Sequence, residues 1–280
     1  MTQVPTDRSI AVSAAELACL DGKVAPALET TIPVLDEGFL RGDGIFEALR
    51  VYSGRAFATT DHLDRLERSA KNLHLELPVP REELEAEITD LIERRGGEAF
   101  DGSLRIVVTR GGRRLILTEP IPDYAELARL AFVTYAPTHI LDGVKSLSYA
   151  ANMLASRIAK ERGFDEALLV TPHGRVLELP TSSIFWVTPN GELCTPPLSD
   201  HILASITRDR LMRIVPDAQE RVCTTEDLLN AREAFVASSV REVQPVGAIE
   251  DRDFGEAGER TREAAAALRA HIEEELGRGL

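Results

Sequence analysis

Short apolar runs broken by glycine dominate the first half of the chain, a pattern typical of strands joined by tight turns. Leu63, Leu66 and Ala70 instead recur at helical spacing after Thr60-Asp61, a pair of residues suited to cap a helix. The pattern predicts strands over residues 30–35, 45–52, 104–109 and 131–135, and helices over about 60–73 and 81–95. Residues 1–10 are polar, and we expect them to be loosely structured.

Turn-forming residues gather over residues 136–143, where Pro137 and Gly143 discourage regular structure, so this stretch is predicted to be a linker. The pattern after it predicts helices over 149–162, 206–214, 225–230 and 259–276, and strands over 167–170, 176–178, 184–187, 193–195 and 234–237. The fold class is therefore α/β. We expect a small N-terminal α/β domain over 1–135, the linker over 136–143, and a large C-terminal α/β domain over 144–280.

Composition and charge narrow the class of protein further. A chain of 280 residues with 44% hydrophobic and 28% charged residues is ordinary for a globular protein. Its formal net charge of −14 argues against nucleic acid or a membrane surface as the main partner, because both attract clustered positive charge. The three cysteines are scattered without metal-ligand spacing, and no apolar run is long enough to span a membrane, so we expect a cytoplasmic protein without a metal.

Two residues suggest a specific chemistry. Lys145 lies in a run of apolar and small residues, and an amine that loses hydration there becomes a nucleophile toward carbonyls. Glu178 precedes the small-residue turn Pro180-Thr181-Ser182-Ser183, where a partly buried carboxylate is able to hold a pyridinium nitrogen. An amine and a carboxylate are the two polar groups that a pyridoxal phosphate site needs most.

Six segments together carry a resemblance to a known family. They are Gly42-Asp43-Gly44-Ile45-Phe46-Glu47, His62-Leu63-Asp64-Arg65-Leu66, residues 104–111, residues 145–149, residues 178–185, and Ile206-Thr207-Arg208. In this order and spacing the chain resembles the class IV aminotransferases, the fold-type IV pyridoxal phosphate enzymes. That family includes branched-chain aminotransferases, D-amino-acid aminotransferases and aminodeoxychorismate lyases. The resemblance implies a two-domain fold like that of D-amino-acid aminotransferases, and a homodimer.

The resemblance also implies roles for individual residues. It places Lys145 as the Schiff-base lysine and proton shuttle, in the large domain, and Glu178 at the pyridine nitrogen. The other cofactor-binding residues that it implies are Arg65, Ile206 and Thr207 at the phosphate, Ser239 in the last phosphate and carboxylate loop, and Tyr149 at the phenolate oxygen. Leu179-Pro180, Ser183 and Ser205 depart from the family's usual residues.

The substrate is less clearly indicated. Arg41 and Arg105 are the expected substrate readers, with Ser239 and Val240 in the loop that the family uses for the carboxylate. Arg41 stands where the family carries an aromatic residue, and Arg113-Arg114 stands where D-amino-acid enzymes have an Arg-x-His pattern. The expected activity is transfer of an amino group between an amino acid, branched-chain or D, and a 2-oxo acid.

Two alternative functions stay open at this point. The first is 4-amino-4-deoxychorismate lyase, because residues 104–111 resemble the corresponding lyase strand; Ala48, where lyases typically carry threonine, argues against it. The second is a non-catalytic pyridoxal phosphate-binding protein on the same scaffold. The presence of Lys145, Glu178 and Arg65 argues against that second alternative.

Overall fold

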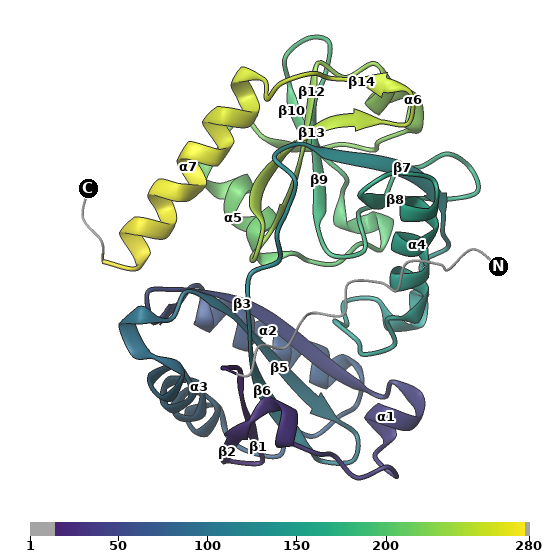
Figure 1. The fold of residues 1–280 in the computed structure, drawn as a ribbon. Helices are drawn as coiled ribbons and strands as arrows, with labels where there is room; N and C mark the ends of the chain where they lie inside the picture. Colours follow the sequence, from purple (N-terminus) through teal and green to yellow (C-terminus); the bar gives the residue numbers. More distant parts are fainter. Residues whose placement is uncertain (1–14, 278–280) are drawn as a thin grey trace, which may run out of the picture. The chain divides into compact units, whose positions relative to one another are not determined.

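The structure is a computed structural model, and it describes residues 15–277; the expectation for residues 1–10 lies outside them. Contacts divide the chain into two compact units. The first unit comprises Met1–Asp123 with Val144–Ser148, and the second comprises Tyr124–Gly143 with Tyr149–Leu280. Both combine helices with a β-sheet, as the α/β prediction requires (Figure 1). No helix within residues 15–277 is long and apolar enough to cross a membrane.

The first unit is built on a six-stranded sheet with the order β2-β1-β6-β5-β3-β4. Its strands are β1 (Leu17–Leu20), β2 (Lys23–Pro26), β3 (Gly44–Tyr52), β4 (Arg55–Ala56), β5 (Gly102–Thr109) and β6 (Arg114–Glu119). Its helices are η1 (Ala27–Glu29), α1 (Glu37–Arg41), α2 (Thr59–Asn72), α3 (Arg81–Arg95) and η2 (Gly97–Ala99). All of the strand pairs are antiparallel, so tight turns suffice to connect neighbours.

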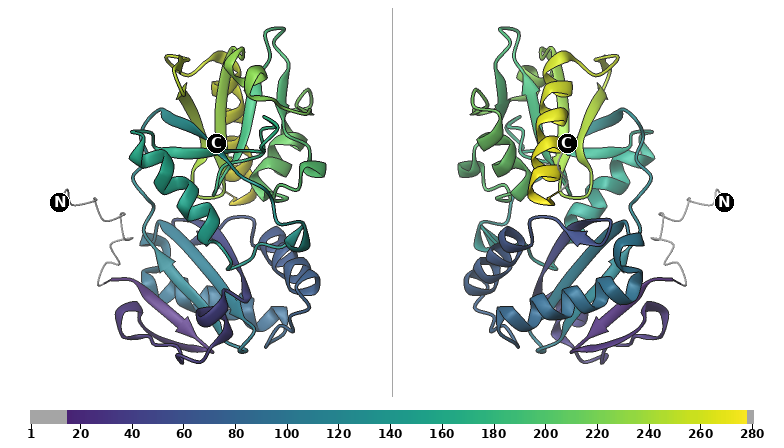
Figure 2. Two further views of the ribbon diagram at one scale, coloured as in Figure 1. Left: turned by 90° about the vertical axis from the view of Figure 1, so that its right-hand side faces the viewer. Right: turned by 90° about the vertical axis from the view of Figure 1, so that its left-hand side faces the viewer.

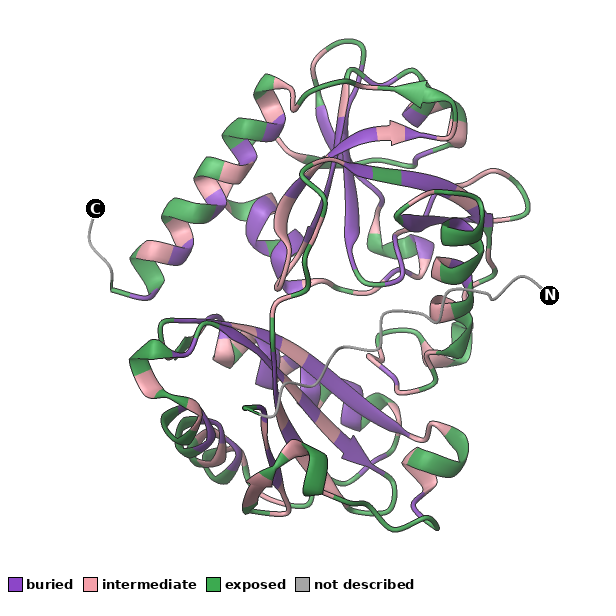
Figure 3. Cartoon of the chain, in the orientation of Figure 1, coloured by how far each residue is buried: buried purple, intermediate pink, exposed green. Residues whose placement is uncertain are grey.

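The two faces of this sheet differ. Alternate residues of β3 and β5, among them Ile45, Leu49 and Leu104, are buried with the apolar face of α2 and α3. Figure 2 shows both helices on one side of the sheet. Several of the intervening residues, such as Ala48 and Arg105, point to the other face and are only half-buried, and Figure 3 shows buried and intermediate positions alternating along these strands. The first unit therefore keeps one sheet face clear of its own helices.

Val144–Ser148 adds a short strand-like segment to the edge of β3. The backbone N–H of Phe46 donates to the carbonyl of Lys145 at 3.0 Å, and Leu147 N–H donates to the Gly44 carbonyl at 2.9 Å. Ser146 forms an isolated antiparallel bridge with Ile45. Backbone pairing thus fixes the position of Lys145 against β3, which explains why this segment belongs to the first unit.

The second unit contains a larger sheet with the order β11-β10-β9-β12-β13-β7-β8, and β14 pairs with β13. Its strands are β7 (Ala128–Thr134), β8 (Glu166–Val170), β9 (Ser183–Val187), β10 (Leu193–Thr195), β11 (Gln219–Glu220), β12 (Glu233–Ser238), β13 (Glu242–Ile249) and β14 (Arg252–Asp253). Its helices are η3 (His139–Leu141), α4 (Ala150–Glu161), η4 (Leu198–Asp200), α5 (Ile206–Ile214), α6 (Thr225–Leu229) and α7 (Glu259–Glu275).

Two strands of this second sheet, β9 in its interior and β8 at one end, are buried on both faces. All residues of β8 and β9 are buried, and such continuous apolar strands need cover on two sides. α4 packs against β7 and β8, whereas α5 and α7 pack against β12 and against each other (Figure 1). The stacked rings of Phe185 and Phe235, 4.9 Å apart, join β9 to β12 in the interior.

Several predicted elements are wrong in detail. Residues 30–35 do not form a strand: Pro33 lies among them, and the segment is largely exposed. Residues 176–178 are not a regular strand, although they lie along β8: Val176 forms an isolated bridge with Val170, and Leu177 and Glu178 exchange backbone hydrogen bonds with Leu169. α2 begins at Thr59, after Ala58 in a left-handed conformation with φ 56°, so Thr60-Asp61 is not its cap. The pattern also missed β1, β2, β6 and β13: β1 and β2 have only four residues each, and β6 and β13 mix apolar residues with charged or polar ones.

The predicted domain boundaries compare with the two units as follows. The predicted linker over 136–143 lies within the second unit, as does the strand predicted over 131–135, because β7 pairs in parallel with β8 and β13. Lys145 belongs by its contacts to the first unit. The division into domains at residues 135 and 144 stays a prediction.

Candidate active site

Lys145 is held at its backbone on both sides. Its N–H donates to the hydroxyl of Ser69 on α2 at 3.1 Å, and its carbonyl accepts from Phe46 on β3. Its ammonium nitrogen lies 4.4 Å from the centre of the Phe46 ring. A cation over an aromatic face is attracted to it, so the ring orients the amine without neutralising it.

Arg105 contacts the same aromatic ring. It lies on β5, opposite Ala48 of β3, and its guanidinium carbon is 5.6 Å from the centre of the Phe46 ring. Its Nε donates to Glu119 at 2.9 Å, and a third of the side chain is exposed. The predicted nucleophile and a predicted substrate reader therefore meet around one phenylalanine of the first unit.

Arg65 lies on the buried side of the same sheet, in a network with Glu47 and His62. Its Nε and Nη2 donate to the two carboxylate oxygens of Glu47 at 2.7 and 2.6 Å. His62 Nδ1 lies 2.7 Å from Glu47 Oε2, and all three side chains are buried. Burial favours a raised pKa for Glu47, but the charge and hydrogen bonds of Arg65 outweigh it and lower the pKa to about 2.

The pKa of His62 is also lowered, but here burial is the dominant cause. Burial lowers the pKa of His62, against the raising effect of the Glu47 carboxylate. The network therefore holds one anion, one cation and a neutral imidazole near neutral pH. This places a firmly positioned guanidinium on α2, within the first unit that also contains Lys145.

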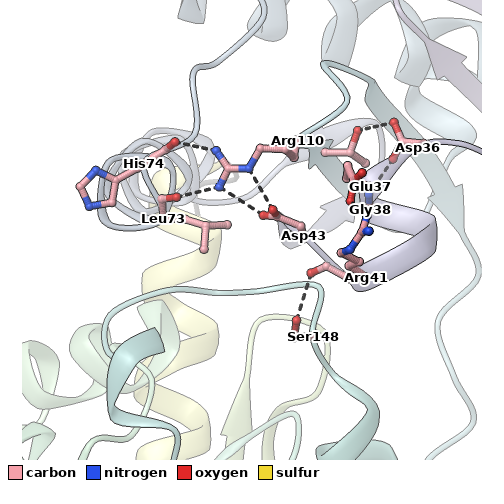
Figure 4. Close-up of polar contacts among 11 residues, drawn as sticks. Asp36, Glu37, Gly38, Arg41, Asp43, Leu73, His74, Arg110 and Ser148 are labelled. Carbon is pink, nitrogen blue, oxygen red and sulfur yellow. Dashed lines mark hydrogen bonds and ion pairs between the residues drawn. The ribbon is translucent and has the colours of Figure 1, made fainter.

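Arg41 has a more exposed position at the end of α1. It pairs with Glu37 one helical turn earlier, and two thirds of its side chain is exposed. Figure 4 shows how α1 is fixed: Asp36 accepts hydrogen bonds from Gly38 and Thr109 at its N-terminus, and Ser148 bonds the carbonyl of Gly42 beyond its C-terminus.

Figure 4 also shows a group of contacts around Arg110, a residue that the sequence analysis does not predict to be important. Its guanidinium donates to both oxygens of Asp43 and to the carbonyls of Leu73 and His74 at the end of α2. Asp43 immediately precedes β3 in the chain, so one side chain joins the β5–β6 hairpin, the start of β3 and the end of α2. In the sequence, the feature that indicates such a role for Arg110 is its place in an Arg-Gly-Gly turn directly after a buried strand.

Glu178 lies in the second unit at the start of a turn over residues 178–183, here called the 178–183 turn. One carboxylate oxygen accepts from the backbone N–H of Leu203 at 3.1 Å. Burial, together with the negative charge of Glu178, raises the pKa of the Tyr135 phenol. The Tyr149 hydroxyl donates to the carbonyl of Pro180 within the turn. Tyr135 and Leu203 are neighbours of Glu178 that the sequence did not reveal.

Two hydroxyl groups of the 178–183 turn are buried without a hydrogen-bond partner among the described residues. They belong to Ser182 and Ser183, whose exposed fractions are 6% and 2%. A buried hydroxyl without a partner costs free energy, which a bound polar ligand would recover. The turn that holds Glu178 therefore has the chemistry of a ligand site, and this fits a polar cofactor such as pyridoxal phosphate.

The expected phosphate-binding residues lie in two further places of the second unit. Ile206 and Thr207 form the first turn of α5, after Ser205 caps it by accepting from Arg208 N–H at 3.3 Å. The first N–H groups of a helix have no partner inside it and favour an anion. Ser239 and Val240 lie in the turn over residues 238–241 between β12 and β13, here called the 238–241 turn.

The structure thus sorts the predicted site residues between the two units. The first unit brings together Lys145, Arg65 and Arg105, with Arg41 on α1; the second contains Tyr149, Glu178, Ile206, Thr207, Ser239 and Val240. Sequence reasoning missed Glu47 and Ser69, which hold Arg65 and Lys145. Glu47 did stand inside a matched segment, but its pattern gave no sign that its partner was Arg65. Within residues 15–277, no cluster of side chains is suited to a metal ion.

Comparison with known proteins decides the family. The model of the family described as amino-transferase class IV matches residues 44–249. The chain belongs to the class IV aminotransferases. A relative from Methanocaldococcus jannaschii, provisionally named a branched-chain-amino-acid aminotransferase, is 33% identical over 83% of this chain and 88% of its own length. The D-alanine aminotransferase of Bacillus licheniformis is 29% identical over 90% of this chain and 95% of its own.

A solved structure agrees with this assignment. The pyridoxal phosphate-bound form of a hypothetical aminotransferase from Mycobacterium tuberculosis superimposes with a TM-score of 0.82, at 25% identity, covering 92% of this chain and 99% of the other. This class IV aminotransferase is a pyridoxal phosphate-dependent enzyme with the fold-type IV architecture. The predicted fold class, cofactor and activity are confirmed, and the comparisons favour neither the lyase nor the non-catalytic alternative.

Proposed function

We propose that the enzyme transfers the amino group of an amino acid with an apolar, branched-chain-like side chain to a 2-oxo acid, with Lys145 as the residue that moves the proton. The observation that carries this proposal is the shared position of Lys145 and Arg105 around the Phe46 ring. One group is a base able to act at the substrate's α-carbon, and the other is a cation able to hold its carboxylate.

The cofactor supplies the electron-withdrawing ring that makes the α-carbon proton removable. Lys145 would accept that proton and return it, since Ser69 and β3 fix its backbone and its amine lies beside the Phe46 ring. Glu178 would place its carboxylate at the ring nitrogen. Arg65, the first turn of α5 at Ile206 and Thr207, and Ser239 would hold the phosphate, and Tyr149 would contact the phenolate oxygen.

The fit of these residues to the cofactor rests on two properties of the fold. The orphaned hydroxyls of Ser182 and Ser183 mark the 178–183 turn as a polar ligand site. Arg65 offers a guanidinium held in place by Glu47, so its side chain needs little further ordering to meet a phosphate. Glu47 accepts two hydrogen bonds from Arg65, and the positive charge of the positioned guanidinium is what Arg65 would contribute at the phosphate.

The sheet face of the first unit that is opposite α2 and α3 supports the choice of substrate. Ala48 and Val107 lie on this face beside Arg105, as does Leu117, which is paired with Arg105 across β5 and β6. An apolar surface around one guanidinium suits a small aliphatic side chain with an α-carboxylate. The name of the relative from Methanocaldococcus jannaschii points to the same class of substrate. Arg41, Ser239 and Val240 complete the expected substrate contacts.

A half-reaction screen tests this proposal. The loaded enzyme is mixed with single L- and D-amino acids without any 2-oxo acid, and the loss of the cofactor's visible absorbance band is followed. L-valine, L-leucine or L-isoleucine should react fastest, and the cofactor should end in its amine form. If D-alanine reacts fastest, the proposed substrate class is wrong, and the activity named for the Bacillus licheniformis relative is supported in its place. Release of pyruvate from aminodeoxychorismate without an amino acceptor would instead support the lyase.

We also propose that the enzyme is a cytoplasmic homodimer. Leu28, Val34, Leu35 and Phe39 of the first unit expose most of their side chains, and a run of exposed apolar residues is typical of an interface. The three cysteines are free and buried, which suits a reducing compartment. Light scattering should give twice the chain mass, and the double variant L35E/F39E should give a monomer. A monomeric parent would contradict the dimer.

A further inference from the structure

Glu166, the first residue of β8, is a buried carboxylate that no proposed role yet uses. Its Oε1 accepts a hydrogen bond from the Thr181 hydroxyl at 3.0 Å, and its Oε2 accepts one from Arg241 Nη2 at 2.6 Å. The side chains of Arg241 and Glu166 are only 8% and 10% exposed. Thr181 belongs to the 178–183 turn and Arg241 ends the 238–241 turn, so one carboxylate bonds to both.

At the 178–183 turn, Thr181 is three residues after Glu178. The backbone of the turn is closed by Leu179 N–H, which donates to the Ser182 carbonyl at 2.8 Å. The Thr181 side chain connects this turn to β8, because its hydroxyl donates to Glu166. Its bond to Glu166 therefore constrains the same short segment that positions the Glu178 carboxylate.

At the 238–241 turn, Arg241 is held from several directions. Its backbone N–H donates to the Ser238 hydroxyl at 3.3 Å, and its guanidinium carbon lies 4.4 Å from the centre of the Tyr124 ring. Its Nε is buried without a hydrogen-bond partner among the described residues. A buried guanidinium is strongly destabilising unless a carboxylate compensates it. Ser239 and Val240 lie between Ser238 and Arg241, which are bonded to each other, so a displacement of Arg241 would displace them too.

Glu166 itself has little freedom to move. β8 pairs in register with β7 from residue 166 onward, and every residue of the strand is buried. Because the strand that carries this carboxylate is closely packed, a displacement of Thr181 is expected to change the position of Arg241, and the reverse. The two turns are thus mechanically joined through one side chain.

We propose that Glu166 is a positioning residue that couples the 178–183 turn, which holds the cofactor ring, to the 238–241 turn, which holds the substrate carboxylate. This inference rests on the proposed function, because the roles of Glu178, Ser239 and Val240 come from it. The contacts of Glu166 are with Thr181 and Arg241, one in each turn. Glu166 acts by keeping the two turns at a fixed separation, so that binding at one is felt at the other.

A double-mutant cycle between T181V and E166Q tests the coupling. T181V removes only the hydroxyl that reaches Glu166, and E166Q removes the charge that compensates Arg241. Three quantities are measured for each enzyme: the dissociation constant of pyridoxal phosphate for the apoenzyme, by absorbance titration; KM and kcat for the 2-oxo acid; and the melting temperature. The titration reports on the site independently of turnover.

For E166Q we expect the pyridoxal phosphate dissociation constant and KM each to rise about 10-fold, with kcat changed less than about 3-fold, since residues that share one network interact by such amounts. T181V, although placed in the cofactor turn, should raise KM for the 2-oxo acid about 3-fold. In the E166Q background T181V should have no further effect. A purely structural role would lower the melting temperature and leave KM and the dissociation constant of the folded enzyme unchanged.

The second unit contains a matched control. Glu192, in the β9–β10 hairpin, also accepts hydrogen bonds from a threonine and an arginine, Thr188 at 3.2 Å and Arg221 at 3.0 Å, but the side chains of Glu192 and Arg221 are 43% and 50% exposed. E192Q and T188V should therefore leave KM and the dissociation constant at parent values. Should E166Q give no folded protein, R241K takes its place in the cycle with the same expectation.

The outcomes separate this inference from the proposed function. If the parent transaminates and the effects of T181V and E166Q simply multiply, the coupling through Glu166 is refuted while the function stands. Unchanged KM and dissociation constants in E166Q refute it equally. If the parent does not transaminate, the proposed function fails, and the pyridoxal phosphate titrations of the same four apoenzymes still decide whether the two substitutions interact.

Discussion

Arg65 donates two parallel hydrogen bonds to the buried carboxylate of Glu47, joining helix α2 to the central strand β3. A bidentate guanidinium–carboxylate pair fixes the relative orientation of its two side chains, and here both are buried. Removing either partner leaves the other as a buried, uncompensated charge, at a typical cost of about 3–5 kcal/mol. The arginine assigned to the cofactor phosphate is therefore also part of the core of the first unit.

The Glu47 carboxylate makes stability depend on pH in a definite direction. Its pKa in the folded protein, about 2, lies below the ordinary 4.5, so it stabilises the fold above pH 4.5 and loses that contribution as the pH falls toward 2. Glu47→Gln should lower the free energy of unfolding by about 3 kcal/mol at pH 7, and the difference from the parent should shrink between pH 5 and pH 2.

Urea unfolding of the parent and Glu47→Gln at several pH values measures that difference. Asp101→Asn is the matched control, because Asp101 pairs with Arg50 in the same unit but is half exposed, and its effect should stay small. A Glu47→Gln penalty that persists undiminished at pH 2 would show that the stabilising interaction does not depend on the carboxylate charge.

Arg65→Ala should weaken retention of the cofactor. The lost charge-assisted contact corresponds to about 1.5–3 kcal/mol, or roughly a 10- to 150-fold higher dissociation constant for pyridoxal phosphate. Because this variant also strands Glu47, the double variant R65A/E47Q is measured beside it. Arg68→Ala on the exposed side of α2 serves as control. Parent-like retention through dialysis by both Arg65 variants would remove Arg65 from the phosphate site.

Arg105→Met should raise KM for the carboxylate substrates about 10- to 100-fold with little change in kcat, because a cation that binds the carboxylate equally in ground and transition states affects only binding. Arg50→Met is its control: Arg50 lies on the same sheet face and is engaged with Asp101. Equal effects of the two substitutions on KM would mean that the face attracts carboxylates only through its general charge.

Glu178→Gln should keep the cofactor bound but slow the half-reaction with the best amino donor about 10²-fold, a typical loss when one preorganised electrostatic contact is removed. Side-chain volume is nearly unchanged, and an amide oxygen still accepts from Leu203 N–H. Rates are taken at equal cofactor content. A half-reaction as fast as in the parent would show that another residue holds the ring nitrogen.

The sequence predicted the parts of the fold that depend on local pattern. β3, α3, β5 and α5 follow from apolar periodicity, and the helix predicted over 149–162 ends before Gly163, whose left-handed φ of 85° is typical of a residue after a helix. It failed where distant segments decide the outcome. β1 and β2 have only four residues each, too few to show a periodic pattern, and they form because β1 pairs with β6 and β2 pairs with β1.

For the site, local sequence and resemblance supplied the residue types but not their partners. Nothing near Arg65 indicates a bond to Glu47, eighteen positions earlier, and nothing near Thr181 indicates Glu166 or Arg241. Such pairs depend on strand register and on which face a side chain occupies, and both are set by the whole sheet. The placement of Lys145 beside β3 escaped prediction for the same reason.

The account depends most on Lys145, and one measurement tests it most directly. The loaded enzyme is reduced with borohydride, digested, and searched by mass spectrometry for the lysine that carries the pyridoxyl group. We predict the group on Lys145 and on no other lysine, and a loss of at least ~10³-fold in transamination rate in Lys145→Ala, with Lys71→Ala as an unaffected control. A pyridoxyl group on any other lysine, or a Lys145→Ala variant that still transaminates at the parent rate, would contradict the assignment.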